Sequence, residues 1–361
     1  DGPPGTGKTT DIITQAPSWG KVAIVTYTND AANTIKLRAP HLRAGTIYSL
    51  SWPYVKQYAK NAKRRVHRSG AYTKRRIDNL MDPALRQYEN DAPSKKERHQ
   101  EDVLAPLLHS WSEGPPPFDL NIQAQRELHY ILPIARWLEA GGYVPEEDKF
   151  EVVVIDEAQD VSSLELRAAK ALVRKGGDLL AYGDPGQAIF ARGKGIEGKE
   201  LPPAWVLADE THRLEGGFRV GDPVASAATK VLKSYYDRPA FTFMAGHETH
   251  IMDWEPDSRP TTGLVLGYSR YSVAKQFKLW GLRQVAVTPT VTRAQEELVL
   301  STGHAAKGGE ADDVYLLPWS HKAVGRFEVK DPDAIRLMYV MMTRAIKRLH
   351  IPRTLKARIL R

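Results

Sequence analysis

Short apolar runs alternate with longer stretches of mixed polarity along the chain. The clearest runs cover 21–26, 151–155 and 178–182, and their apolar residues are mostly Val, Ile, Leu and Ala. Runs of this length are typical of strands buried in a parallel sheet, and the stretches between them can hold the helices that connect parallel strands. The pattern predicts an α/β fold in which parallel sheets are flanked by helices.

The pattern changes between 51 and 148. This stretch has many basic residues, scattered Trp and Tyr, few β-branched runs, and a Gly-Pro-Pro-Pro break at 114–117. We interpret it as a helical insertion into the α/β fold. The full length of 361 residues is enough for two or three domains, each with a core of its own.

The apolar runs, such as 152–155 and 263–266, are far shorter than the roughly 20 residues that a membrane-spanning helix needs. We therefore expect no membrane association, and no targeting segment is visible. The sequence has no cysteine, which excludes disulfides and cysteine-ligated zinc or iron-sulfur sites and suits a reducing compartment. The expected location is the cytoplasm, with a bacterial or phage-infected cell as a fitting host.

The positive charge is concentrated in one part of the chain. Residues 51–100 contain 13 Lys and Arg against 5 Asp and Glu, which accounts for the whole net charge of +8. Aromatic residues lie among these basic residues, a combination that can hold phosphates and stack on unpaired bases. A solvated basic helix face is the alternative interpretation. The candidate phosphate contacts in this basic stretch are Lys63, Arg64, Arg65 and Arg68.

A phosphate-binding loop is encoded at the start of the chain, where residues 2–9 read GPPGTGKT. Its glycines allow backbone N–H groups to surround phosphate oxygens, while Lys8 reaches the β- and γ-phosphates and the Thr9 hydroxyl binds Mg²⁺. A buried strand normally precedes such a loop, so we expect the sequence to be a fragment. The candidate nucleotide contacts here are Gly2, Pro3, Pro4, Gly5, Thr6, Gly7, Lys8, Thr9 and Thr10.

Two adjacent carboxylates, Asp156 and Glu157, follow the apolar run EVVVI. At the carboxyl end of a strand the first can hold Mg²⁺ and the second can polarise the attacking water. Two acids that merely cap the next helix are the simpler interpretation, but the phosphate loop makes it much weaker. The pair predicts ATP and Mg²⁺ as cofactors.

Phosphoryl transfer also needs positive charge near the transferred group and a residue that senses it. Gln187 in GDPGQAIF, Arg213 in THRLEGG and Arg344 in YVMMTRA are the candidates. An isolated arginine is more often a surface residue, so these assignments depend on the other motifs.

The chain resembles the UvrD/Rep family of superfamily 1A DNA helicases in the order of its motifs, which are GPPGTGKT, VTYTNDAA, GTIYSL, VVVIDEAQD, AYGDPGQAIF, THR, STGHAAKGGE and LMYVMMTRA. DEAQD followed by GDPGQ and YVMMTRA separates this family from RecD-like and Pif1-like helicases. The resemblance implies that Gln187 senses the γ-phosphate, that Arg213 and Arg344 reach it from a second domain, and that Glu310 binds the ribose. It also implies a set of residues facing the nucleic acid: Tyr27, Thr28, Asn29, Tyr48, Ser49, Thr302 and His304.

The chain departs from the family pattern at several positions. His212 stands where the family has an aromatic that stacks on adenine, and Tyr48 replaces a histidine. The motif III aromatic that stacks on a DNA base is missing, so this role would fall to Phe190 or Tyr27. The glutamine motif that selects adenine is absent from the sequence. The interval 271–300 is too short for the family's large 2B insertion.

The resemblance implies two RecA-like P-loop NTPase domains, one formed by 1–50 and 151–207 and the other by 208–361, with a 1B-like helical insertion at 51–150. The expected function is an ATP-dependent 3′ to 5′ DNA helicase acting on single-stranded DNA and single-strand/duplex junctions. Three alternatives stay open: a translocase or protein-displacing ATPase that does not separate duplexes, a nucleotide-gated binding module, and an RNA substrate.

Overall fold

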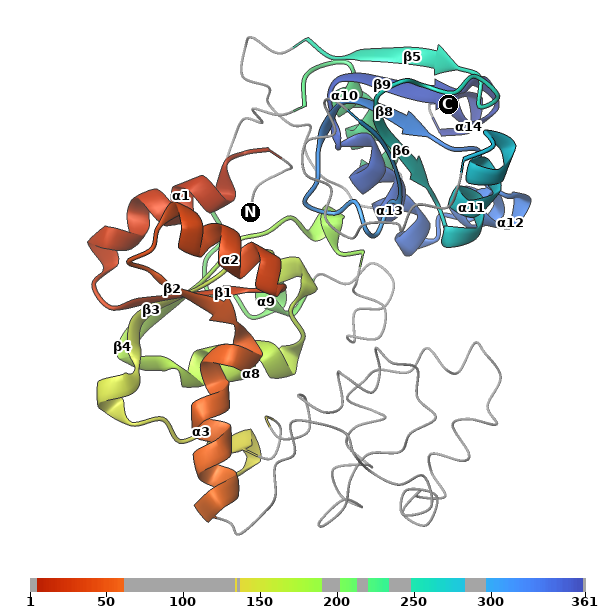
Figure 1. The fold of residues 1–361 in the computed structure, drawn as a ribbon. Helices are drawn as coiled ribbons and strands as arrows, with labels where there is room; N and C mark the ends of the chain where they lie inside the picture. Colours follow the sequence, from red (N-terminus) through yellow and green to blue (C-terminus); the bar gives the residue numbers. More distant parts are fainter. Residues whose placement is uncertain are drawn as a thin grey trace, which may run out of the picture.

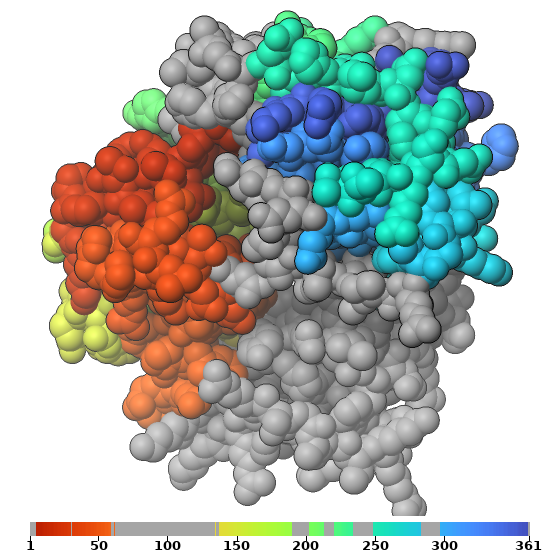
Figure 2. Space-filling view, turned by 45° about the horizontal axis from the view of Figure 1, so that its top comes forward, coloured from red at the N-terminus to blue at the C-terminus, as the bar shows by residue number. Residues whose placement is uncertain are grey.

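The computed structural model describes residues 5–61, 134, 137–189, 202–212, 220–233, 248–282 and 297–359. These residues form two α/β units, each built on its own parallel sheet (Figure 1). In the space-filling view, the surface of residues 5–61 and that of the second unit lie on opposite sides (Figure 2). The predicted fold class of two P-loop NTPase-type units with parallel sheets is confirmed.

The first sheet has the strand order β2-β1-β3-β4. All three strand pairings are parallel, and Val25 of β1 lies opposite Ile155 of β3. The predicted strands at 21–26, 151–155 and 178–182 are confirmed, although the last begins earlier than expected. The strands are β1 (Val22–Thr26), β2 (Arg43–Thr46), β3 (Phe150–Ile155) and β4 (Val173–Ala181).

Helices cover both faces of this sheet, because the side chains of β1 and β3 alternate between two apolar cores. Val22, Ile24, Val152 and Val154 pack with residues of α1 (Lys8–Gln15) and α2 (Asn29–Arg38). The intervening residues of the same strands pack toward α3 (Ile47–Asn61) and α8 (Ser163–Ala171). Figure 1 shows α1 and α2 on one side of the sheet and α3 and α8 on the other.

Helix α3 continues across position 50, where the insertion was expected to begin. The core of the first unit includes Trp52 and Val55 of this helix. It also includes Ile134 and Trp137, which lie in the second half of the predicted insertion. The expected boundaries at 50 and 150 therefore fall inside segments that pack on this core. The rest of the predicted insertion, 62–133, lies outside the described residues.

The second sheet has the strand order β5-β9-β8-β6-β7, and its pairings are also parallel. Its two faces are covered by α11 on one side and by α10 and α13 on the other. The strands are β5 (His250–Trp254), β6 (Gly263–Gly267), β7 (Leu298–Thr302), β8 (Ala311–Leu316) and β9 (Ala345–Pro352). The helices are α10 (Val224–Lys233), α11 (Arg270–Leu279), α12 (His321–Glu328), α13 (Pro332–Met342) and α14 (Arg353–Ile359).

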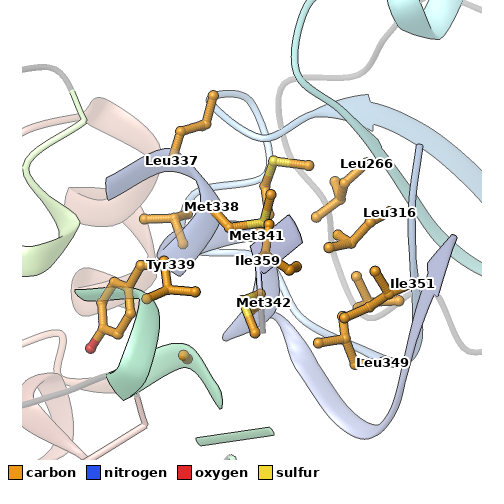
Figure 3. Close-up of a cluster of buried hydrophobic side chains, with 14 of the residues drawn as sticks. Leu266, Leu316, Leu337, Met338, Tyr339, Met341, Met342, Leu349, Ile351 and Ile359 are labelled. Carbon is orange, nitrogen blue, oxygen red and sulfur yellow. The ribbon is translucent and has the colours of Figure 1, made fainter. Parts of the chain in front are cut away.

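Helix α13 is the centre of the second core. Every residue from Ala334 to Met342 is buried, which is expected of a helix that packs on several sides. Figure 3 shows Met342 beside Ile359 and Leu349, whereas Tyr339 points away from the sheet leucines Leu266 and Leu316. The Tyr339 hydroxyl thus lies on a side of the helix that faces away from these sheet leucines.

Among the residues that the structure describes, no helix combines the length and apolar character needed to cross a bilayer.

Candidate nucleotide site between the two units

The phosphate loop leads directly into α1. Gly5 and Gly7 have φ values of 75° and 78°, in the left-handed region that residues with a Cβ avoid, and Gly7 is the N-cap of the helix. This geometry directs the first N–H groups of α1 away from the helix, where they can bind phosphate oxygens. Lys8 and Thr6 are buried at the loop. Gly2, Pro3 and Pro4 lie outside the described residues.

Asp156 immediately follows β3, at the sheet edge where α1 begins. The Thr9 hydroxyl donates a hydrogen bond of 2.9 Å to its Oδ2, and the backbone N–H of Glu157 donates one of 3.0 Å to its Oδ1. Burial raises the pKa of Asp156 to about 6, and the neighbouring charge of Glu157 adds to this rise. The oxygen atoms of a buried carboxylate and a threonine hydroxyl are ligands that suit a hard cation such as Mg²⁺, and such a cation would stabilise the ionised form of Asp156.

Glu157 has a φ of 58°, one of two positive values among the described non-glycine residues. Its Oε2 accepts a 2.5 Å hydrogen bond from Gln159 and lies 3.5 Å from the Lys307 Nζ. Burial raises the pKa of Glu157, but the positive charges of Lys307 and Lys8 outweigh it and hold the pKa below its usual range. The carboxylate is therefore ionised at neutral pH and can accept a proton from water.

Gln187 and Arg344 come from different units and contact each other. Gln187 ends the 3₁₀ turn η4 (Pro185–Gln187), and its Oε1 accepts a hydrogen bond of 3.3 Å from the Arg344 Nη2. Arg344 is 1% exposed and also donates to the carbonyls of Val340 and Gly309. The side chain is therefore a buried cation of the second unit that is aimed at the first.

Two further contacts across the units involve residues that the sequence analysis did not single out. The Lys307 Nζ donates hydrogen bonds to Asp160 and, at 3.0 Å, to the carbonyl of Gln187. The Tyr339 hydroxyl donates a 2.9 Å hydrogen bond to Asp184 Oδ2. All four residues lie in motifs that the sequence already marks: Lys307 in STGHAAKGGE, Tyr339 in LMYVMMTRA, Asp160 at the end of DEAQD and Asp184 at the start of DPGQ. Their polar side chains within these motifs were the sequence signal that could have identified them.

The predicted nucleic-acid contacts of the first unit follow the carboxyl ends of β1 and β2. The Thr28 hydroxyl caps α2 by accepting from the Ala31 N–H, and the Ser49 hydroxyl donates to the Thr46 carbonyl. The Tyr48 hydroxyl donates a 2.9 Å hydrogen bond to the buried Glu165. Tyr27 lies just before these capping residues and Asn29 begins α2.

In the second unit, Thr302 ends β7 and its hydroxyl accepts a 3.2 Å hydrogen bond from the Ala305 N–H. His304 is exposed two positions later. Both sets of residues thus lie where ligands usually bind in parallel α/β sheets, beyond the carboxyl ends of the strands.

The remaining predicted residues have varied positions. The Thr10 hydroxyl accepts a 2.9 Å hydrogen bond from Arg38 of α2, and Glu310 precedes β8 with its side chain half-buried. The side chain of His212 is 87% exposed and lies 3.4 Å from Glu210. The predicted site residues outside the described part of the chain are Phe190, Arg213, Lys63, Arg64, Arg65 and Arg68.

Two parallel α/β units, with a phosphate loop and an acid pair on one and a buried arginine from the other, form the arrangement of a P-loop nucleotide-binding protein. The sequence model of a family described as AAA domain matches residues 1–192, more than half of the 361-residue chain, and the chain belongs to this family. No curated protein sequence matches the chain.

Solved structures of viral helicases are similar to the chain. The PRRSV helicase is 17% identical over 99% of this chain and 52% of its own, with a TM-score of 0.48. Arterivirus nonstructural protein 10 (helicase) is 16% identical over 100% and 61%, and its complex with DNA 15% over 99% and 62%, each with a TM-score of 0.46. The chain thus spans between about half and three fifths of the length of these helicases.

Proposed function

We propose that this protein is the motor of a UvrD/Rep-like superfamily 1 DNA helicase, in which ATP hydrolysis between the two units moves the chain along single-stranded DNA. The observation that carries the proposal is the direct contact of Arg344 with Gln187 across the units, beside Glu157. A site divided in this way makes nucleotide binding depend on how the units are placed relative to each other. Hydrolysis can then drive relative movement.

The proposed chemistry assigns one role to each side chain. Lys8 and the N–H groups at the start of α1 hold the β- and γ-phosphates, while Thr9 and Asp156 hold Mg²⁺, which supplies positive charge to the phosphates when bound. Glu157 accepts the proton of the attacking water. Gln187 and Arg344 bind the γ-phosphate, and Arg344 stabilises the charge that develops during its transfer. Arg213, His212 and Glu310 are proposed to complete the contacts to phosphate, base and ribose.

Movement along single-stranded DNA follows because both units carry residues that are proposed to bind the DNA. Tyr27, Thr28 and Asn29 follow β1 of the first sheet, whereas Thr302 ends β7 of the second sheet and His304 follows it. When ATP bridges the two units these surfaces approach each other, and after hydrolysis they separate. The 3′ to 5′ direction comes only from the resemblance to the UvrD/Rep family.

The proposed domain division follows the two cores. We place the first RecA-like domain around the first sheet, including α3 to Asn61 and the chain from 134 to 207, because these described segments share its core. The 1B-like insertion is then 62–133, and the second RecA-like domain is 208–361. The basic residues Lys63, Arg64, Arg65 and Arg68 fall in this insertion and are proposed to bind phosphates of the strand.

A translocase that does not separate duplexes is the second candidate. The short interval between α11 and β7, from Leu279 to Leu298, favours it because there is no room there for a large domain that could engage a duplex. The helicase and the translocase share the same ATPase cycle. They differ only in whether the duplex ahead of the protein is separated.

The test is the ATPase rate of the chain with no nucleic acid, with single-stranded DNA and with single-stranded RNA of equal length. We expect single-stranded DNA to raise kcat about tenfold or more, and Lys8→Ala to abolish the activity because the phosphates lose their main cation. Lys356→Ala, at a half-buried lysine of α14 that pairs with Asp253, is the matched control and should behave like the parent. Turnover that no nucleic acid stimulates would contradict a motor and leave a nucleotide-gated module.

Displacement of streptavidin from either end of a strand, measured beside unwinding of a tailed duplex, separates the two candidates. Unwinding at the translocation rate identifies a helicase. Streptavidin displacement without unwinding identifies the translocase, and faster displacement from the 5′ end than from the 3′ end would contradict the proposed polarity.

A further inference from the structure

Lys307 extends from the loop between β7 and β8 of the second unit into the first unit. Its side chain is only 9% exposed and its ion-pair partner Asp160 only 1%. The Nζ contacts the Asp160 carboxylate, the Gln187 carbonyl at 3.0 Å and the Glu157 Oε2 at 3.5 Å. One lysine thus meets both turns of the first unit that carry the proposed water-activating and γ-phosphate-sensing residues.

This ion pair differs from the lysine pairs on the surface. Lys356 and Asp253, for example, are 2.7 Å apart, but their side chains are 33% and 44% exposed. An exposed pair contributes little, because water solvates each charge equally well when the pair separates. A buried pair exists only while its two sides are held together, and removing one partner leaves a charge without solvation. The ion pair of Lys307 therefore depends on how the two units are placed relative to each other, whereas the pair of a surface lysine does not.

The same loop also fixes Arg344. The Gly309 carbonyl, two positions after Lys307, accepts a hydrogen bond from the Arg344 Nη1. Arg344 in turn binds the side chain of Gln187, while Lys307 binds its backbone. The loop thus contacts Gln187 directly through Lys307 and indirectly through Gly309 and Arg344. A shift of the loop therefore changes all of these contacts together.

The beginning of this loop holds Thr302 and His304, two of the predicted nucleic-acid contacts. The turn is tightly fixed: the Gly303 N–H donates to the Gly267 carbonyl, and the Ala306 N–H donates to the Thr302 carbonyl. A Cβ at Gly303 would lie 2.6 Å from Met341 of α13 and 2.8 Å from Leu337, so the loop packs directly on that helix. A loop held this closely moves as a body, and displacement at Thr302 is carried to Lys307.

We propose that Lys307 is a positioning residue that transmits binding of a nucleic-acid strand at Thr302 and His304 to Glu157 and Gln187. The inference deepens the proposed function and rests on it for the identity of the strand. Lys307 acts through the residues that it places and does not itself touch the reacting atoms. Its contribution is expected in turnover and in strand stimulation, and not in nucleotide affinity.

The experiment compares Lys307→Met, Lys307→Arg and the double variant Asp160→Asn/Lys307→Met in the full chain. The readouts are kcat and KM for ATP with no nucleic acid and with saturating oligo(dT), and the Kd of a fluorescent non-hydrolysable ATP analogue. Lys307→Met should lower basal kcat about tenfold, with KM and Kd within about twofold of the parent, and reduce stimulation by oligo(dT) to less than about twofold. Lys356→Met is the matched control, because it removes an ion-paired lysine from the same unit and should keep all values.

The other two variants separate positioning from a mere loss of stability. Lys307→Arg keeps the charge and should retain most of the stimulation. The double variant leaves no unpaired buried carboxylate, so it should regain thermal stability while its stimulation stays low. Restored stimulation in the double variant, or equal losses in kcat and analogue binding for Lys307→Met, would overturn the proposal. A parent that oligo(dT) does not stimulate would contradict the proposed function, and an unchanged basal kcat of Lys307→Met would then contradict the positioning role independently.

Discussion

The two units are built alike but contribute opposite chemical groups to their interface. At the contacts between them, the first unit supplies acceptors, namely the carboxylates of Asp160 and Asp184 and the amide oxygen of Gln187. The second unit supplies the donors Lys307, Tyr339 and Arg344. The first unit can cradle a nucleotide with its own loop and acids, but it lacks the cations that reach the site from the other side. Under the proposed function, nucleotide binding can therefore begin on the first unit, whereas turnover needs both units.

The two units also hold their functional groups differently. Asp156 and Glu157 follow a strand and lie in the turn that leads to η3 (Ala158–Asp160), where a few polar contacts, most of them within the first unit, fix them. Arg344 follows a helix that is buried from Ala334 to Met342, and its position is set by the packing of a large core. A change in the first unit should therefore act locally, whereas a change near Arg344 is resisted by many contacts.

Removing the cation of the second unit should have the largest effect. Arg344→Ala is expected to lower kcat about 10³-fold or more, because the developing charge on the transferred group loses its partner. Binding of a non-hydrolysable analogue, measured by fluorescence titration, should change far less. Arg344→Lys is the control that keeps a charge but loses the forked hydrogen bonds to Gln187 and Gly309. Equal losses in analogue binding and turnover would mean that Arg344 stabilises the ground state.

Removing the proton acceptor of the first unit should have the next largest effect. Glu157→Gln keeps the shape of the side chain but cannot take a proton from water, and kcat should fall about a hundred- to a thousandfold. ATP binding should persist, which equilibrium binding of labelled ATP would measure. Glu165→Gln alters another buried glutamate of the same unit and serves as the comparison. A kcat within about threefold of the parent would remove Glu157 from the role of base.

The buried carboxylate Asp156 should make stability depend on pH. Its pKa is raised from 3.8 to about 6 in the folded chain, so the folded state binds a proton more readily than the unfolded state. The stability that this proton provides is present below pH 4 and is lost as pH rises through about 6. In metal-free buffer at pH 7.5, Asp156→Asn should therefore raise the free energy of unfolding by about 3 kcal/mol. Urea unfolding at pH 4 and 7.5 measures this, with the exposed Asp178→Asn as control; an equal gain at both pH values would exclude titration of Asp156 as the cause.

The smallest effect is expected from the neutral contact between the units. Tyr339→Phe removes one hydrogen bond to Asp184, which keeps its bonds from Gln187 and from the Gly186 N–H. The loss should weaken closure by about 1 kcal/mol and raise KM for ATP about fivefold without a large change in kcat. Steady-state ATPase measurements test this against Tyr143→Phe, an exposed tyrosine of the first unit. A KM equal to that of the parent would show that the contact does not contribute to closure.

The sequence predicts elements whose signal is local. The strands β1, β3 and β4 were predicted because each is an apolar run, and Lys8, Thr9, Asp156 and Glu157 meet because each lies in or beside a strand-end motif. The contacts of Lys307 with Asp160 and of Tyr339 with Asp184 were not predicted, since they join positions 147 and 155 residues apart. Nor was the bond between Tyr48 and Glu165, because only the packing of α3 against α8 brings these residues together. The placement of the two units relative to each other depends on such long-range contacts, which no local pattern encodes.

The left-handed backbone at Glu157 implies a conflict between durability and activity. A side chain in this region costs about 1–3 kcal/mol, and glycine would relieve that cost at once. A selection for thermal resistance alone would therefore favour glycine at this position, and under the proposed function each such variant would lack the base that activates water. Under the proposed function, a heat-selected library of this chain would need a simultaneous requirement for ATP turnover, because relief of the strained backbone at position 157 removes the proposed base.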